Sequence, residues 1–309
     1  MSALATVILA HSDPAKTRRL IGALAGTDVF LHCDRRAPDD VVRRMVSGTG
    51  PDVTLVPRRR TSLSSWSLVE AELAALRLAL ERSRADHIAV LSGSCYPLLS
   101  VAEMVQELSD WRGLSRIQLN PLPWRPWDTP RNPNGGYWRF RRRFVTLRGQ
   151  IVTIRRVPLR LFRRAIPAGL RLHASSQWKV YARHHAAGLL RVLGDSPEQR
   201  RFWQTTLVPD ESCAASILAS PELVGSISDE LRDDSPWFIK WPPGQATGHP
   251  QWLEEPDFPM LQAARSAPPR DPHHDIPKSE HGAFRKLFAR KLSSRERPLL
   301  DCIDKELRT

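Results

Sequence analysis

Two acidic motifs place a carboxylate where it could take part in chemistry. The first is Pro209-Asp210-Glu211, which follows a strand-like run at residues 205–208 and begins an expected helix at residues 210–219. A carboxylate in the first turn of a helix is favoured by the helix dipole, and it can act as a general base when a hydroxyl lies within hydrogen-bond reach. The alternative interpretation is structural, with Asp210 as the helix cap and Glu211 interacting only with the dipole.

The second motif is His32-Cys33-Asp34, in which Asp34 follows an apolar strand expected at residues 29–32. A carboxylate at the end of a strand can accept a hydrogen bond from a hydroxyl or an N–H group of a ligand. It can equally cap the turn that precedes Pro38. Both interpretations are open from these residues.

The elements that must position these residues alternate along the first 120 residues. Apolar runs predict strands at residues 5–10, 29–32, 53–56 and 88–91, and helical periodicity predicts helices at 14–25, 39–46, 67–80 and 101–108. Ser67 and Glu70 have the spacing of a capping box at the third helix. The alternation predicts an α/β fold, a mainly parallel twisted sheet flanked by helices. His11, Asp34 and Ser92-Gly93 follow strands, so they should meet at the carboxyl edge, where such sheets bind ligands.

The later part of the chain is less regular. We expect strands at residues 177–182 and 237–241, a helix at 183–193, a loop at 264–279 and a short basic helix at 284–292, with no internal repeat. Residues 121–171 break the pattern, because Trp124, Trp127 and Trp138 are mixed there with arginine, proline and glycine. We interpret this stretch as an insertion with short helices.

Length and composition are compatible with one large domain. The 309 residues and a hydrophobic content of 41% are sufficient for a substantial core. The four cysteines show no C-x-x-C spacing, which favours isolated thiols in a reducing compartment. The first ten residues resemble a strand more than a signal peptide, and no apolar run approaches the roughly 18 residues of a membrane span. We therefore expect a cytoplasmic protein without a transmembrane segment.

Positive charge is concentrated in one segment. The formal net charge is +13, yet residues 129–194 contain fifteen Arg and Lys and no Asp or Glu, which leaves a net charge of −2 for the rest of the chain. Such a segment can attract an anionic partner: a phosphorylated acceptor, an anionic membrane surface or a nucleic acid. The alternative is an arginine-rich face that is simply solvated.

Six short blocks occur in a fixed order along the chain, and a basic block follows them. They are Ile8-Leu9-Ala10-His11, His32-Cys33-Asp34-Arg35-Arg36-Ala37-Pro38, Ser65-Trp66-Ser67, Leu91-Ser92-Gly93-Ser94-Cys95-Tyr96-Pro97-Leu98, Ser176-Gln177-Trp178, Pro209-Asp210-Glu211 and the basic Phe288-Ala289-Arg290-Lys291. Their order and spacing resemble the core-2/I-branching β-1,6-N-acetylglucosaminyltransferase family, which also contains the peptide O-xylosyltransferases. The resemblance covers roughly residues 5–292. It implies one GT-A-type glycosyltransferase domain over residues 1–309. Because eukaryotic members of the family are anchored in membranes and this sequence shows no anchor, we expect a bacterial-type member.

The resemblance implies an inverting, metal-independent transfer of GlcNAc or xylose from a UDP-sugar, with GlcNAc slightly favoured. Glu211 would be the catalytic base. The nucleotide would contact Ala10, His11, Asp34, Ser92 and Gly93, and the diphosphate would contact Lys291 and Arg290, with Lys240 as a weaker candidate. The family uses basic side chains in place of a metal, and the chain contains no D-x-D motif. No cofactor is expected. His273-His274-Asp275 is the nearest cluster of potential metal ligands, but its spacing and its position in an expected loop are weak evidence for a metal site.

Ser176, Gln177 and Trp178 resemble the family's segment at the acceptor cleft, and Trp241 is a further stacking candidate. The alternative for Trp178 is core packing. The acceptor would be a glycan, a natural product or a peptide. Ser94-Cys95 departs from the family pattern, which usually has Gln-Asp or a similar pair near the donor sugar. This departure leaves open a catalytically inactive relative that binds glycans or partners. The acid-free arginine segment and its aromatic residues leave open a second alternative, a basic nucleic-acid-binding protein.

Overall fold

A central seven-stranded sheet organises the described part of the chain. The computed structural model describes residues 3–50, 52–111, 113–155, 157–243, 249–269 and 278–308. The strand order is β16-β6-β15-β4-β1-β2-β3. The strands are β1 (Leu4–Ala10), β2 (Asp28–Cys33), β3 (Val53–Leu55), β4 (His87–Ser92), β6 (Ser115–Ile117), β15 (Lys179–Ala182) and β16 (Leu231–Asp233). All neighbouring pairs are parallel except those of β15, which runs antiparallel to β4 and β6. The predicted mainly parallel α/β fold is therefore confirmed.

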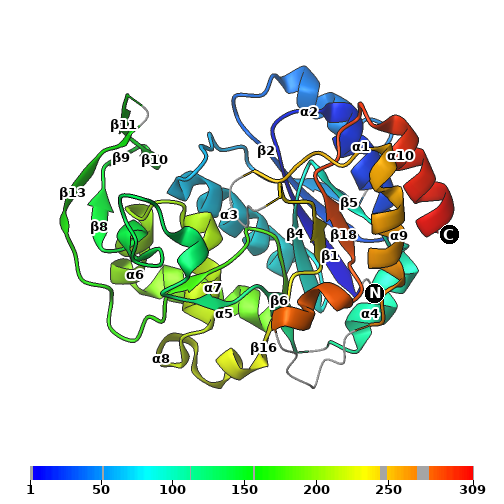
Figure 1. Ribbon diagram of the computed structural model, residues 1–309. Coiled ribbons are helices and arrows are strands. Elements are labelled where there is room, and N and C mark those ends of the chain that lie inside the picture. The colour runs from blue at the N-terminus through cyan, green and yellow to red at the C-terminus, as the bar shows by residue number, and fades with distance from the viewer. Residues whose placement is uncertain are drawn as a thin grey trace.

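Helices cover both faces of this sheet (Figure 1). α1 (Pro14–Ala23) packs beside α2 (Asp39–Val46), and α3 (Trp66–Arg82) packs beside α5 (Arg183–Asp195). Every residue of β1 is buried, and so is every residue of β4 except Ser92. Continuous apolar strands of this kind occur where a parallel sheet is covered on both faces. This explains why unbroken apolar runs identified these strands in the sequence.

A second, three-stranded sheet brings distant segments together beside the first. β18 (Phe288–Arg290) lies between β5 (Cys95–Pro97), to which it is antiparallel, and β17 (Trp237–Ile239), to which it is parallel. The predicted strand at 237–241 is thus confirmed over three residues. The predicted basic helix at 284–292 is wrong, because Phe288 and Ala289 are fully buried by pairing between two strands. Long-range pairing overrides a local helical preference here.

The remaining helices differ from prediction mainly at their ends. α4 (Val101–Ser109) begins with a true capping box formed by Ser100 and Glu103. α9 (Phe258–Ser266) extends into the predicted loop, and a 3-10 turn (Lys278–Ala283), α10 (Arg297–Cys302) and a π-helical turn (Ile303–Leu307) follow. The expected Ser67–Glu70 capping box is absent: α3 has Ser65 at its N-cap, and the Ser67 hydroxyl accepts a hydrogen bond from the Ser62 amide.

The segment before Glu211 is not a strand. α6 (Pro197–Gln204) is followed by an irregular turn, in which the Thr206 hydroxyl donates to the Phe202 carbonyl and the Val208 backbone is left-handed. A 3-10 turn (Pro209–Glu211) then precedes α7 (Cys213–Leu218), α8 (Pro221–Val224) and a further 3-10 turn (Gly225–Glu230). The predicted strand at 205–208 and helix start at Asp210 are both wrong, because the β-branched residues end a helix instead of pairing.

The insertion consists mainly of short antiparallel strands. They are β7 (Asn120–Pro121), β8 (Arg142–Phe144), β9 (Thr146–Leu147), β10 (Gln150–Ile151), β11 (Thr153–Ile154), β12 (Val157–Pro158), β13 (Arg160–Arg163) and β14 (His173–Ala174). The expected short helices reduce to two 3-10 turns, Arg125–Trp127 and Tyr137–Arg139. Arg148 and Gly149 both have positive φ between β9 and β10, as a two-residue hairpin turn requires. No helix in the described ranges is long and apolar enough to cross a bilayer.

Candidate active site

The first, second and fourth blocks meet at the carboxyl edge of the central sheet. β1 pairs with β2 on one side and with β4 on the other, so β1 is the point at which the order of strands in the sheet reverses. The amide of Asp34 donates to the Ala10 carbonyl at 2.9 Å, and that of Gly93 donates to the Leu9 carbonyl at 3.1 Å. His11 is exposed at the same edge. Ligands of open α/β sheets bind at such switch points.

Asp34 lies at this edge, but its carboxylate is buried and fully engaged. It accepts hydrogen bonds from the amide and guanidinium of Arg36 and from the amide and hydroxyl of Thr61. Burial by itself raises the pKa of the carboxyl, yet the hydrogen bonds from Arg36 and Thr61 bring it well below its usual range. Asp34 therefore joins two loops in this structure, as in the capping interpretation. Its contact with a nucleoside stays a prediction.

Gly93 is required by packing. A Cβ at this position would lie 2.9 Å from the Thr17 hydroxyl of α1 and 3.3 Å from the Cβ of Ala10. The first contact is shorter than real Cβ atoms show and the second is tight, so the Thr17 side chain or the Ala10 strand would have to shift. The glycine thus lets β4, β1 and α1 approach one another where the first and fourth blocks meet.

Arg290 connects three blocks. It stands opposite Cys95 in the β18–β5 pair, and its Nη1 donates to the hydroxyl of Ser92 and, at 2.8 Å, to that of Ser94. Its guanidinium carbon lies 4.4 Å from the ring centroid of Trp178, a side chain that is only 9% exposed. The serine that departs from the family pattern therefore holds Arg290, while Cys95 is completely buried.

Lys291 and Lys240 differ in their surroundings. The ammonium of Lys291 lies 4.8 Å from the ring of Trp252, and partial burial together with the Arg290 charge lowers the pKa of Lys291. Lys240 instead forms an ion pair of 2.6 Å with Asp257, so its charge is already compensated. Trp241 is 37% exposed, and Trp252, which no sequence pattern singled out, is 49% exposed beside Lys291.

Glu211 is held by a residue of the insertion. Its side chain is 40% exposed, and its Oε2 accepts a hydrogen bond of 3.2 Å from Nη1 of Arg139, whose side chain is 14% exposed. The guanidinium of Arg139 also lies 3.8 Å from the ring of Trp127. Burial lowers the pKa of Arg139, and the charge of Glu211 opposes that shift. An arginine 72 residues away in sequence gave no local signal, so this partner was not foreseen.

The backbone of Glu211 leads to the acceptor segment. The Ser175 amide donates to the Glu211 carbonyl at 2.8 Å, and the Trp178 amide donates to the Ser176 hydroxyl at 3.1 Å. Gln177, between them, is partly exposed. Through Trp178 and its contact with Arg290, the predicted base and the predicted diphosphate residue lie at two ends of one short segment.

Asp210 is buried rather than a helix cap. Its Oδ1 has no hydrogen-bond partner among the described residues. Burial, and then the charge of Glu211, raise the pKa of Asp210 to about 7. Beneath it, the carboxylate of Glu72 accepts a hydrogen bond of 2.7 Å from the Tyr181 hydroxyl and one of 3.5 Å from the Lys179 ammonium. The charges of Lys179 and Glu72 in this cluster, like that of Glu211, act on Asp210.

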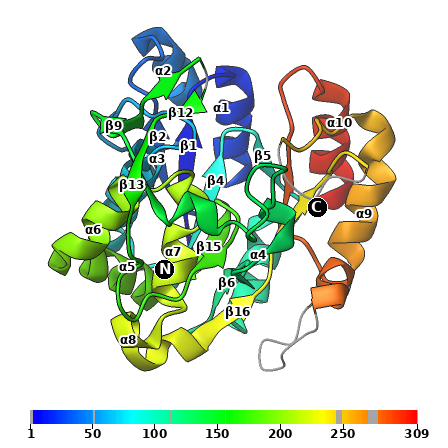
Figure 2. The same ribbon diagram turned by 60° about the vertical axis from the view of Figure 1, so that its left-hand side comes forward.

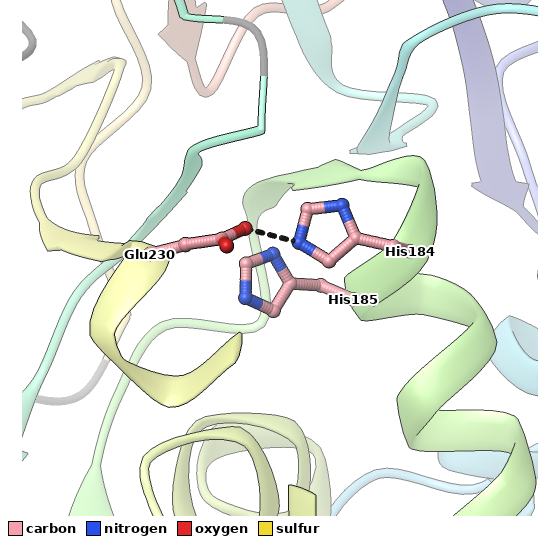
Figure 3. A group of neighbouring side chains, drawn as sticks. All are labelled: His184, His185 and Glu230. Carbon is pink, nitrogen blue, oxygen red and sulfur yellow. Dashed lines mark ion pairs between the residues drawn. The ribbon is translucent and has the colours of Figure 1, made fainter. Parts of the chain in front are cut away.

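A histidine cluster at the start of α5 does not have the character of a metal site (Figure 3). His184 Nε2 lies 2.7 Å from Glu230, while both ring nitrogens of His185 are engaged, with Ser115 at 2.8 Å and the Ile227 carbonyl at 2.7 Å. Because a carbonyl can only accept, His185 Nε2 carries the proton and donates to Ile227, so the Nδ1 of the neutral ring accepts from the Ser115 hydroxyl. His185 is therefore satisfied without an ion. His273-His274-Asp275 lies outside the described residues.

A cavity of about 770 Å³ is separate from these residues. It is lined by α1, by the connection from α2 to β3, and by residues near α10 that include Arg297. None of the predicted site residues lines it. The candidate site is instead an open edge, formed by strand ends and loops.

The family model described as Core-2/I-Branching enzyme matches residues 27–260. The chain belongs to the core-2/I-branching enzyme family. Members of this family are glycosyltransferases, so the chain is a sugar-transferring enzyme that uses a sugar donor and an acceptor. Its fold agrees with the GT-A-type architecture expected from the sequence. No curated protein matches it. A solved structure from Bacillus anthracis, assigned as a glucose-1-phosphate thymidylyltransferase in complex with a sucrose, is 13% identical, with a TM-score of 0.33 over 65% of this chain and 78% of that chain.

Proposed function

We propose that this core-2/I-branching enzyme is an inverting, metal-independent transferase that moves GlcNAc or xylose from a UDP-sugar to an acceptor hydroxyl. The acceptor is a glycan, a natural product or a peptide. One observation carries the proposal. Residues 175–178 contact the Glu211 backbone at one end and the Arg290 guanidinium at the other, so the accessible carboxylate of Glu211 and the cations Arg290 and Lys291 lie on either side of one segment. The cytoplasmic location expected from the sequence stays a prediction.

Glu211 is suited to the role of base. Its carboxylate would accept the proton of the acceptor hydroxyl while that oxygen attacks the anomeric carbon. The bond from that carbon to the diphosphate breaks, and its electron pair leaves with UDP, so one displacement inverts the configuration. Arg139 fixes one carboxylate oxygen and leaves the other free to receive the proton. A base within reach contributes about 10²–10⁴-fold to the rate.

Arg290 and Lys291 are suited to the leaving diphosphate. Neither forms an ion pair with an acidic side chain of the described residues, and Arg290 is held by two neutral hydroxyls. Partly buried cations without a counter-charge attract an anion strongly, and they stabilise charge that develops on it. Lys240 is paired with Asp257 and is the weaker candidate. Trp252, beside Lys291, offers a ring face to the donor.

UDP release from UDP-GlcNAc and UDP-xylose, measured with EDTA present, tests the proposal. We expect turnover to persist in EDTA and to fall at least 100-fold in Glu211→Gln, with UDP affinity unchanged. Glu222→Gln is a matched control, because Glu222 is an exposed glutamate that also pairs with an arginine. Activity that EDTA abolishes would contradict the role of the two cations. Unchanged turnover in Glu211→Gln would contradict the role of the base, and UDP binding without turnover would favour an inactive relative.

A further inference from the structure

The described part of residues 141–163, here called the arginine arm, forms a ribbon of short strands. β8 pairs with β13, β9 with β10, and β11 with β12. Val145, Val152 and Leu159 join the three hairpins through backbone hydrogen bonds of 2.9 Å. The arm extends from the side of the molecule away from α9 and α10 (Figure 1), and it comes to the front in the turned view (Figure 2).

The arm is attached to the body at its base and at one hairpin. The Phe144 amide donates to the Thr205 carbonyl at 3.0 Å, and the Ile151 amide donates to the Ser65 hydroxyl at 2.8 Å. Beyond these contacts, all four residues of β13 and both residues of β11 are exposed. The far part of the ribbon therefore presents both of its faces to the surroundings.

Large apolar side chains are concentrated on this exposed part. Of the eleven exposed large apolar residues in the described ranges, six belong to the arm: Leu147, Ile154, Val157, Leu159, Leu161 and Phe162. Ile154 is 59% exposed and Phe162 is 65% exposed. A concentration of exposed apolar side chains in one segment of a folded protein indicates an interaction site.

Arginines alternate with these apolar residues, and no acid is present. The exposed arginines are Arg141, Arg143, Arg148, Arg155, Arg160 and Arg163. Residues 129–194 contain no Asp or Glu, and none of these six is ion-paired with an acidic side chain in the described part of the chain. The arm therefore combines uncompensated positive charge with exposed aliphatic and aromatic groups at the same place.

We propose that the arginine arm binds the surface of an anionic membrane. Aliphatic side chains enter the boundary between lipid headgroups and acyl chains, and neighbouring arginines pair with anionic headgroups. A nucleic acid would use the arginines but would leave five aliphatic side chains in water, because bases stack on aromatic rings. A second copy of this chain would bring two sets of uncompensated arginines together. The membrane is the partner that satisfies both properties, and this inference does not rest on the identity of the donor or of the base.

Binding of the full chain to lipid vesicles tests the proposal. We expect cosedimentation with vesicles that contain phosphatidylglycerol, weaker binding at high salt, and little binding to pure phosphatidylcholine. Ile154→Ser/Phe162→Ser should weaken binding about 100-fold, since each partly inserted side chain contributes about tenfold. Arg155→Gln should weaken it about fivefold. Leu55→Ser/Met260→Ser is the matched control, because these residues are 51% and 49% exposed outside the arm.

Each other outcome overturns the proposal. Vesicle binding that survives Ile154→Ser/Phe162→Ser would assign it to another surface. Binding to a single-stranded oligonucleotide without vesicle binding, unchanged in that variant, would identify a nucleic-acid partner. A dimer in light scattering that the variant converts to a monomer, again without vesicle binding, would show self-association. Circular dichroism and the unfolding midpoint establish that each variant is folded, so loss of binding cannot arise from unfolding.

Discussion

Asp210→Asn should change how the stability of the protein depends on pH. Asp210 is buried beside Glu211, and burial raises its pKa to about 7 from an ordinary 3.8. At a pH between these two pKa values, Asp210 keeps its proton in the folded protein but has lost it in the unfolded chain. The carboxyl therefore costs no stability at low pH, and it destabilises the fold increasingly as the pH rises toward 7. An asparagine is neutral throughout and has no such cost.

The size of the effect follows from linkage. A pKa of about 7 in the folded state and 3.8 in the unfolded state gives a penalty that grows by about 2–3 kcal/mol between about pH 5 and pH 8. The free energy of unfolding of Asp210→Asn, minus that of the parent chain, should rise by this amount over the same range. A constant offset from the buried amide does not matter, because only the slope with pH is compared.

Urea denaturation followed by circular dichroism at several pH values measures this difference. Buried groups that do not interact with Asp210, such as His87 and His185, contribute equally to both chains and cancel. Asp195→Asn is the control, because Asp195 is an exposed aspartate at the end of α5. Two parallel curves for Asp210→Asn and the parent would refute the reasoning, since Asp210 would then be ionised in the folded protein over the whole pH range compared.

Two further predictions concern the arginines of the site. Arg290→Lys keeps the positive charge but loses the planar guanidinium that donates to Ser92 and Ser94, so the KM for the donor should rise about tenfold in a steady-state assay. The control is Arg295→Lys at an exposed position, which should have no effect in the same assay. Arg139→Met should lower kcat about tenfold without changing donor affinity, because Glu211 loses the hydrogen bond that orients it. The control is Arg141→Met, since Arg141 stacks on Tyr137 and has no contact with Glu211; an equal loss there would assign the effect to packing.

Much of the fold was predictable because local sequence and tertiary environment agree there. β1 and β4 are continuous apolar runs, and a parallel sheet covered on both faces requires such strands. Strand ends collect at one edge for topological reasons, so the proximity of Ala10, Asp34 and Gly93 followed from the alternation of elements. The order of the short blocks identified the family, and the family model agrees.

The predictions that failed depended on distant partners. Phe288, Ala289 and Arg290 have a sequence compatible with a basic helix, but pairing with β5 and β17 makes them a strand. The insertion formed hairpins where short helices were expected, because positive φ at Arg148 and Gly149 favours a turn between strands.

The sequence by itself determined which residues could do chemistry and at which strand ends they lie, because residue type and hydrophobic periodicity are local properties. Only the tertiary structure decided which of them are available. It engaged Asp34 with Arg36 and Thr61, paired Lys240 with Asp257, and left Arg290 and Lys291 without a counter-charge among the described residues. Burial and charge compensation depend on contacts between residues far apart in the chain, such as Arg139 and Glu211, and no local pattern encodes them.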